Sequence, residues 1–402
     1  MIASSADSAA RLRKVKITFG LIYFLFMSSR AIFGPFITVF LKERGLSAEM
    51  IGIVIGINSI MIILTQPVWG IVTDKIGSTR KTLVICIICQ AMFALALLFA
   101  PSVLLLSTFF CIYTAFASSE GPLMDMWSLK SVKEAGDGNA LGQLKLWGCI
   151  GYALCSTAAG LFINRSSTNA ILPVFTFVLV GIAAFMFFVR GSDVAGRGTA
   201  RLRDMQLGRI FKDHTFLIFL AYVFFMQIAH RGSFTFYSLL IKQLGGDTAI
   251  VGYSGALMFV SEAVVMASAK KMLGRFKPVY LVMASSFFFM LWHVFLSLST
   301  SPYHVMLSCL MDGPSFALFT IGTLYYLDAL APKEIRTTYQ TVAYAVYFGL
   351  SGIVGNVASG FMIDRWGYRT MYAVGIGLTF LSTAVFYAVT KVRDRRRMGL
   401  SR

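Results

Sequence analysis

Twelve apolar runs, each long enough to cross a lipid bilayer, constrain what this 402-residue chain can fold into. A membrane-spanning helix needs roughly 20 mostly apolar residues, and 57% of the residues are hydrophobic while 13% are charged. A soluble protein of this composition would lack the polar surface to cover its core. The sequence therefore predicts an all-α membrane protein with twelve transmembrane helices. The runs cover residues 17–42, 49–73, 82–100, 103–128, 143–163, 170–189, 215–241, 249–269, 278–299, 303–327, 338–363 and 371–390.

The distribution of basic residues predicts the orientation of these spans. The chain has 36 Lys and Arg against 18 Asp and Glu. Outside the runs, the basic residues gather before the first run, in every second loop and after the last run. Cytoplasmic loops of membrane proteins carry such an excess. We therefore expect a multi-pass protein of a bacterial inner membrane with both termini in the cytoplasm, and no nucleic-acid partner.

The chain also repeats itself at an offset of 200 residues. Gly52-x-x-x-Gly56 recurs as Gly252-x-x-x-Ala256, and the segment GLFINR, which begins at Gly160, recurs as GFMIDR. A common offset in several runs indicates duplication of a six-helix unit, and six helices return the chain to the side where it started. Rows of small residues such as these let helices approach closely. We predict two bundles in the same orientation, 1–189 and 215–402, joined by a basic cytoplasmic linker, 190–214.

A polar motif follows the second run, with Gly70, Asp74, Gly77, Arg80 and Lys81 at its fixed positions. Taken alone it is a cytoplasmic turn, in which the aspartate can pair with a basic side chain or a helix end. Together with twelve spans and a duplication, it resembles the loop 2–3 signature of the major facilitator superfamily. The resemblance covers the whole chain. It implies transport by alternating access and places these five residues at a cytoplasmic gate.

Within that superfamily the chain resembles the lactose-permease-like and phenylpropionate-permease-like proton symporters. The stretches around Gly121-Pro122 and 142–155 are similar to the span 4–5 region of lactose permease, where a carboxylate, a base and an aromatic ring hold the sugar. The resemblance puts Asp125, Lys145 and Tyr152 in these three roles. It also puts Glu262 at the family's buried span-8 glutamate. The segment that begins with His230 and Arg231 resembles the start of span 7 in the phenylpropionate-permease group.

The chain departs from the lactose-permease pattern at several positions. A lysine at 145 lacks the bidentate fork of the arginine that it replaces, and Trp292 stands at the position of the span-9 arginine. His230-Arg231 replaces the paired span-7 aspartates, and Arg30 in the first span has no counterpart. Lactose itself is therefore not the expected substrate.

Ionisable side chains inside the spans point to a transport pathway without help from the resemblance. Inserting a charged side chain at the centre of a membrane helix costs roughly 2.5–3.5 kcal/mol of free energy. The spans contain four carboxylates and three permanently charged cations, so at least one carboxylate has no cation to pair with. We expect that carboxylate to bind and release a proton during turnover. We favour Glu262, which has no acid or base within four residues, then Asp312, where Gly313-Pro314 could open the helix. The ionisable residues are Arg30, Glu120, Asp125, Lys145, His230, Arg231, Glu262, His293 and Asp312.

These observations predict a monomeric secondary transporter that moves a small polar organic solute with a proton, using the proton gradient and no cofactor. If the arginines pair with carboxylates, a sugar-like or nucleoside-like solute is favoured. If they bind the substrate, an aromatic acid is favoured. The expected substrate-binding residues are Arg30, Asp125, Lys145, Tyr152, His230 and Arg231, and the expected proton-coupling residues are Glu262, Asp312 and Glu120.

Three other functions compete with this prediction. A drug or metabolite exporter driven by proton antiport would have a more apolar cavity, and the seven charges besides the histidines argue against it. A sensor or partner subunit without transport would be expected to lose those charges. A membrane enzyme would need a catalytic or metal-binding constellation, and the sequence contains no HExxH, GxSxG or Walker A motif and no clustered Cys and His. We therefore predict no catalytic residues and no metal site.

Overall fold

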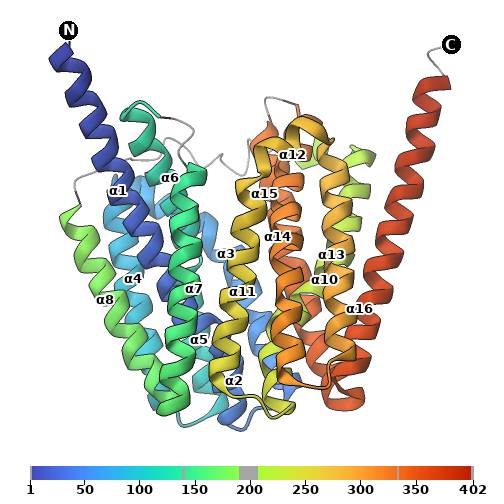
Figure 1. Ribbon diagram of the computed structural model, residues 1–402, viewed down its shortest axis with the longest axis horizontal. Coiled ribbons are helices and arrows are strands. Elements are labelled where there is room, and N and C mark those ends of the chain that lie inside the picture. Colours follow the sequence, from blue (N-terminus) through green and yellow to red (C-terminus); the bar gives the residue numbers. More distant parts are fainter. Residues whose placement is uncertain (1, 138–140, 190–206, 333–334, 400–402) are drawn as a thin grey trace. The chain divides into compact units, whose positions relative to one another are not determined.

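The computed structural model describes residues 2–137, 141–189, 207–332 and 335–399, and every regular element in these ranges is a helix (Figure 1). Within these ranges, eleven helical stretches are long and apolar enough to cross a membrane. The last of them, Thr338–Val392, contains a non-helical residue, Gly367, with φ +80° and ψ 171°. That turn separates the eleventh and twelfth predicted spans. The all-helical membrane fold predicted from the sequence is therefore confirmed.

The helices fall into two compact units. Unit 1 takes in the described residues within Met1–Arg44, Ile60–Thr199 and Gly246–Ala263, and unit 2 takes in those within Gly45–Ser59, Ala200–Gly245 and Val264–Arg402. Two helices, α3 (Ala48–Ile76) and α11 (Thr248–Ala267), contribute to both units. The predicted bundles, 1–189 and 215–402, were defined by the duplication in the sequence, and this division stays a prediction. Residues 190–206 of the predicted linker lie outside the described ranges.

Unit 1 is built on two long helix pairs, in which α1 packs along α7 and α4 packs along α8. Small residues bring the first pair together, since a Cβ on Gly151 would overlap the backbone oxygen of Phe24. The edge of the Trp127 ring packs on Phe19 at a centroid distance of 4.9 Å. The helices that lie wholly in this unit are α1 (Ile2–Phe33), α2 (Ile37–Glu43), α4 (Thr79–Ala96), α5 (Val103–Ala117), α6 (Glu120–Glu134), α7 (Leu141–Arg165) and α8 (Ile171–Phe188).

Unit 2 is built in the same way, with α10 packed along α16 and α13 along α14. A Cβ on Gly355 of α16 would lie 2.5 Å from the backbone oxygen of Ile228 in α10, which shows how closely the two backbones approach. A cluster of buried aromatic and aliphatic side chains fills the space between these helices. The elements are α9 (Leu207–Ile210), α10 (His214–Gln243), α12 (Ala269–Arg275), α13 (Pro278–Leu298), α14 (Pro302–Leu330), α15 (Arg336–Tyr344), the π-helix η6 (Ala345–Leu350) and α16 (Ser351–Gly399).

The repeated motif found in the sequence lies at helix ends. In unit 2, the Asp364 carboxylate accepts the backbone N–H groups of Ala48, at 3.2 Å, and Glu49, at 2.8 Å, and so caps the N-terminus of α3. In unit 1, the repeat partner Asn164 donates to the Asp247 carboxylate at 3.0 Å, and Asp247 in turn accepts the N–H of Ile250 in α11. The duplicated segment therefore holds the first turn of a neighbouring helix in each unit.

Some spans are irregular, and one expected irregularity is absent. The fourth span breaks between α5 and α6 at Ser118-Ser119, and a π-helix of six residues interrupts the eleventh. The expectation that Gly313-Pro314 opens the tenth span is wrong, because α14 is continuous from Pro302 to Leu330. A proline is tolerated within a membrane helix when side chains and neighbouring helices stabilise the turn. Here the Ser315 hydroxyl donates to the backbone oxygen of Asp312 at 2.5 Å.

Candidate functional site

The break in the fourth span creates the first acid–base contact. Glu120 begins α6, is 2% exposed, and lies 3.8 Å from the Nη2 atom of Arg30 near the end of α1. Because α5 ends at Ala117, its backbone oxygen lacks a partner within that helix, and Arg30 reaches it at 3.5 Å. The second carboxylate oxygen of Glu120 is buried and has no hydrogen-bond partner among the described residues. The two predicted site residues on α1 and α6 are thus in contact.

A second acid–base contact joins α6 to α7. The Lys145 Nζ atom donates to Asp125 at 2.8 Å, and the Tyr23 hydroxyl of α1 donates to the other carboxylate oxygen. Both charged side chains are about two-fifths exposed, at 43% for the lysine and 40% for the aspartate. The structure thus brings together the acid and the base that the resemblance assigned to one substrate site. Their role in substrate binding stays a prediction. Sequence reasoning missed Tyr23, which lies 102 residues from its partner.

The aromatic ring that the resemblance assigned to the substrate is packed against protein. Tyr152 of α7 is 7% exposed and stacks on Phe259 of α11, with centroids 3.5 Å apart and planes inclined by 16°. Glu262 lies on the same helix as Phe259, is partly buried, and has an electrostatic interaction with Cys149 of α7. The roles predicted for Tyr152 and Glu262 stay predictions.

The third acid–base contact lies in the core of unit 2. The His230 Nε2 atom of α10 is 2.9 Å from the Asp312 carboxylate of α14, and the other ring nitrogen is 3.1 Å from the Gln227 amide oxygen. His230 is 2% and Asp312 is 4% exposed. The Phe289 ring of α13 lies 4.3 Å from the imidazole, and Trp292 lies 5.8 Å from it. His230 and Asp312 are separated by 82 positions in the sequence, so no local sequence pattern predicts their contact.

Arg231 follows the histidine on α10, and its surroundings differ. The guanidinium carbon lies 4.2 Å from the centroid of the Phe348 ring in η6. Its Nε and Nη2 atoms are buried and have no hydrogen-bond partner among the described residues. No carboxylate of the described residues lies within ion-pair distance of this side chain.

The predicted gate motif occupies the end of α3 and the start of α4. Gly70 lies within α3, and Gly77 adopts φ +70°, a conformation that favours glycine. Arg80 donates to the backbone oxygen of Val189 at 2.8 Å, just beyond the end of α8. Asp74 makes no hydrogen bond or ion pair with the described residues, and Lys81 donates its backbone N–H to Ser78. A gating role for the motif stays a prediction.

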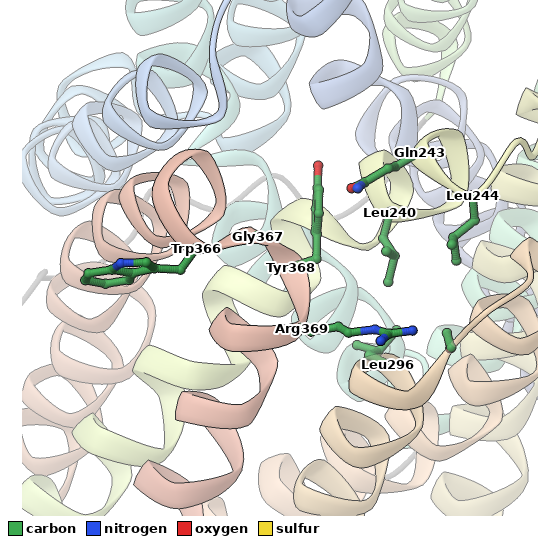
Figure 2. Close-up of a pocket in the computed structure, with 9 residues that line it drawn as sticks. Leu240, Gln243, Leu244, Leu296, Trp366, Gly367, Tyr368 and Arg369 are labelled. Atoms are coloured by element: carbon green, nitrogen blue, oxygen red, sulfur yellow. The ribbon is translucent and has the colours of Figure 1, made fainter.

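A pocket of about 340 Å³ lies in unit 2, where α10 and α13 end and the chain turns at Gly367 (Figure 2). The Arg369 side chain extends into it, while Trp366 points away. None of the predicted substrate-binding or proton-coupling residues lines it. The described residues contain no group of three His, Cys, Asp or Glu side chains that could hold a metal ion.

Comparison with known proteins gives a consistent result. Residues 16–374 match the model of the MFS_1 like family. A maltose permease of Geobacillus stearothermophilus is 25% identical over 94% of this chain and 95% of its own length. A probable 3-phenylpropionic acid transporter of Escherichia coli (strain K12) is 23% identical over 88% of this chain and 93% of its own length. The crystal structure of the nucleoside transporter NupG superposes with a TM-score of 0.80 at 17% identity, covering 95% of this chain and 99% of that one.

Proposed function

This chain belongs to the MFS_1 like family, and from that premise we propose that it is a proton-coupled transporter that brings a small polar organic solute into the cell. Membership and the permease relatives make it a multi-pass secondary transporter and not an enzyme. The coupling ion, the direction of transport and the class of solute are our inferences from the buried charges and the relatives.

The observation that carries the proposal is the set of three acid–base contacts inside candidate membrane spans. They join Arg30 to Glu120, Lys145 to Asp125, and His230 to Asp312. A charge buried in a membrane protein is costly, and pairs of this kind mark substrate and ion pathways. Two pairs involve permanently charged cations, whereas the third joins two groups that both titrate.

We place the proton on the third pair. Histidine changes its charge near neutral pH, and an aspartate whose side-chain partner is a histidine can accept a proton without leaving a permanent cation unpaired. Burial of Glu120 favours its protonated form, but the Arg30 guanidinium 3.8 Å away opposes protonation, and a protonated Glu120 would leave that permanent cation unpaired. Glu262, which the sequence favours, is less buried than Asp312 and remains the competing proton site.

We assign solute binding to the remaining predicted residues, Arg30, Asp125, Lys145, Tyr152 and Arg231, with His230 at their border with the proton site. The relatives support a small organic solute, since one is named for maltose and another for 3-phenylpropionic acid. In this proposal the protein works as a monomer in a bacterial inner membrane, with both termini in the cytoplasm. It uses the proton gradient and no bound cofactor.

Uptake into proteoliposomes tests this proposal. Purified full-length protein, reconstituted at matched pH, should accumulate a radiolabelled solute from a panel of sugars, nucleosides and aromatic acids only when the outside is made acidic. A protonophore should abolish accumulation, and a sodium gradient at fixed pH should not replace the proton gradient. Accumulation that follows sodium would refute the coupling. Solute expulsion driven by inward proton flow would instead identify a proton-antiport exporter.

A further inference from the structure

Arg231 differs from the other fixed cations that the sequence places inside spans. Arg30 and Lys145 each contact a carboxylate, at 3.8 Å and 2.8 Å. Arg231 contacts no described carboxylate, although two of its nitrogens are buried and have no hydrogen-bond partner there. A guanidinium carries five N–H donors and keeps its charge at any physiological pH. An unpaired buried charge is strongly unfavourable unless something supplies the missing partner.

Asp312, the acid that interacts electrostatically with Arg231, already has a hydrogen-bond partner. Asp312 interacts with Arg231 over a longer range, but its carboxylate is hydrogen-bonded to His230 at 2.9 Å. The other electrostatic neighbours of Arg231 are the hydroxyl groups of Tyr344 and Tyr347. A neutral phenol cannot compensate the guanidinium charge. The missing partner is therefore an anion that the described residues do not provide.

The π-helix η6 gives this arginine an aromatic surrounding. The Phe348 ring lies against the guanidinium, and it contacts Tyr344 with centroids 4.5 Å apart and Tyr347 with centroids 4.6 Å apart. Tyr344 is 37% exposed, so this group of rings is not sealed inside the helix packing. Single π-helical turns within α-helices are frequent at functional sites. Aromatic rings in this arrangement can stack on a planar ligand.

We propose that Arg231 and the rings of Phe348, Tyr344 and Tyr347 form the binding site for the carboxylate of an aromatic monocarboxylic acid, the substrate of the transporter. The inference rests on the proposed function and deepens it. A guanidinium binds a carboxylate through two parallel hydrogen bonds. One unpaired cation matches one negative charge, so a dicarboxylate or a phosphate ester would bring charge that nothing at this site compensates.

Thermal stability of the purified full-length protein in detergent tests the site. The probes are benzoate, phenylacetate and indole-3-acetate, each compared with its neutral amide, because a ligand that binds the folded state raises Tm. At least one acid should raise Tm with a concentration dependence that its amide lacks. Chloride and inorganic phosphate, at the same ionic strength, should leave Tm unchanged.

Two arginine variants make the test specific. Arg231→Gln should weaken binding of the acid roughly 10- to 100-fold, the range expected for a lost charge-assisted contact. Arg365→Gln is the matched control, since its guanidinium also lies over a phenyl ring, Phe361 at 3.7 Å, but is exposed. Without ligand, Arg231→Gln should be at least as stable as the wild type, because an unpaired charge has been removed. A large drop in its Tm would make Arg231 a structural residue and overturn the proposal.

Other outcomes also decide the question. Equal stabilisation by an acid and its amide, full binding by Arg231→Gln, or no response to any of the three acids would each overturn the anion site. Proton-driven accumulation of a neutral sugar, with no acid bound, would overturn it too while leaving the proposed function intact. Failure of every solute to follow the proton gradient, with acid binding preserved, would overturn the coupling but not the site.

Discussion

At the scale of single residues, the histidine next to Arg231 changes the charge count made from the sequence. Counting four carboxylates against three fixed cations predicts that a carboxylate is left over. The count omits His230, which takes Asp312 as its partner. The fixed cation on the next residue is then left without an acid. A composition count can show that charges are unequal in number, but only the fold decides which charge lacks a partner, because His230 and Asp312 lie 82 residues apart in the sequence and Arg30 and Glu120 are also distant.

We predict that Asp312→Asn abolishes uphill accumulation and preserves downhill exchange of solute. The amide can still hydrogen-bond to His230, so the fold survives, but it cannot bind and release a proton. Uptake into proteoliposomes with and without an inward proton gradient measures both activities. Asp328→Asn is the control, because Asp328 lies on the same helix in an exposed ion pair with Arg336. Glu262→Gln should retain accumulation, and the reverse pattern would move the proton site to Glu262.

We also predict that Asp125→Asn weakens solute binding with little effect on stability. The Asp125–Lys145 pair is about two-fifths exposed, and exposed pairs contribute only about 0–1 kcal/mol. A large loss of binding with an almost unchanged Tm would separate a ligand contact from a structural one. Glu134→Gln serves as control, since Glu134 forms an exposed pair with Lys130 farther along α6. Unchanged affinity in Asp125→Asn would remove this residue from the binding site.

At the scale of helices, the sequence predicted regular features well and irregular ones poorly. The spans follow from apolar length, a local property, and most of their predicted bounds agree with the helices to within a few residues. The exceptions are polar extensions of apolar helices, since α1 begins at Ile2, α6 continues to Glu134 and α16 continues to Gly399. The repeated small residues were expected to bring helices together, and Gly52 and Gly252 do so in their units. The π-helix at 345–350 and the continuity of α14 through Pro314 were not predicted, because both depend on what packs around the turn.

One helix contact in unit 1 joins segments from the two sequence halves. A Cβ on Gly252 of α11 would overlap the backbone oxygen of Ser156 in α7, and the Ser156 hydroxyl donates to the Gly252 oxygen at 2.9 Å. We predict that Gly252→Val separates these two helices. A cysteine introduced at position 156, after serine has replaced the six native cysteines, reports the separation. It should be shielded from alkylation in the parent and reactive in the variant.

Gly181→Val provides the matched control for that experiment. Gly181 is in α8 of the same unit, and a Cβ there would meet nothing within 4 Å. This variant should leave the cysteine at position 156 as shielded as in the parent. If Gly252→Val also leaves it shielded, the close approach tolerates a larger side chain and is not a contact that transport has to break.

At the scale of the whole molecule, the anion site and the proton site together predict the electrical character of transport. A monocarboxylate that crosses with one proton carries no net charge, whereas a neutral sugar that crosses with a proton carries one positive charge. A membrane potential of 100 mV supplies about 2.3 kcal/mol per elementary charge, which corresponds to roughly 50-fold accumulation. The two solute classes therefore respond very differently to an imposed potential.

We predict that transport is electroneutral. Proteoliposomes loaded with potassium and treated with valinomycin, at equal pH on both sides, acquire an inside-negative potential in potassium-free buffer. They should take up no more aromatic acid than vesicles without the potential. A pH gradient of one unit, with the potential clamped at zero, should instead drive about tenfold accumulation, because each solute molecule enters with one proton. Accumulation driven by the potential alone would mean that more than one proton crosses with each anion or that the solute is neutral. A transport cycle with one anion bound at Arg231 and one proton carried by the His230–Asp312 pair would then be wrong.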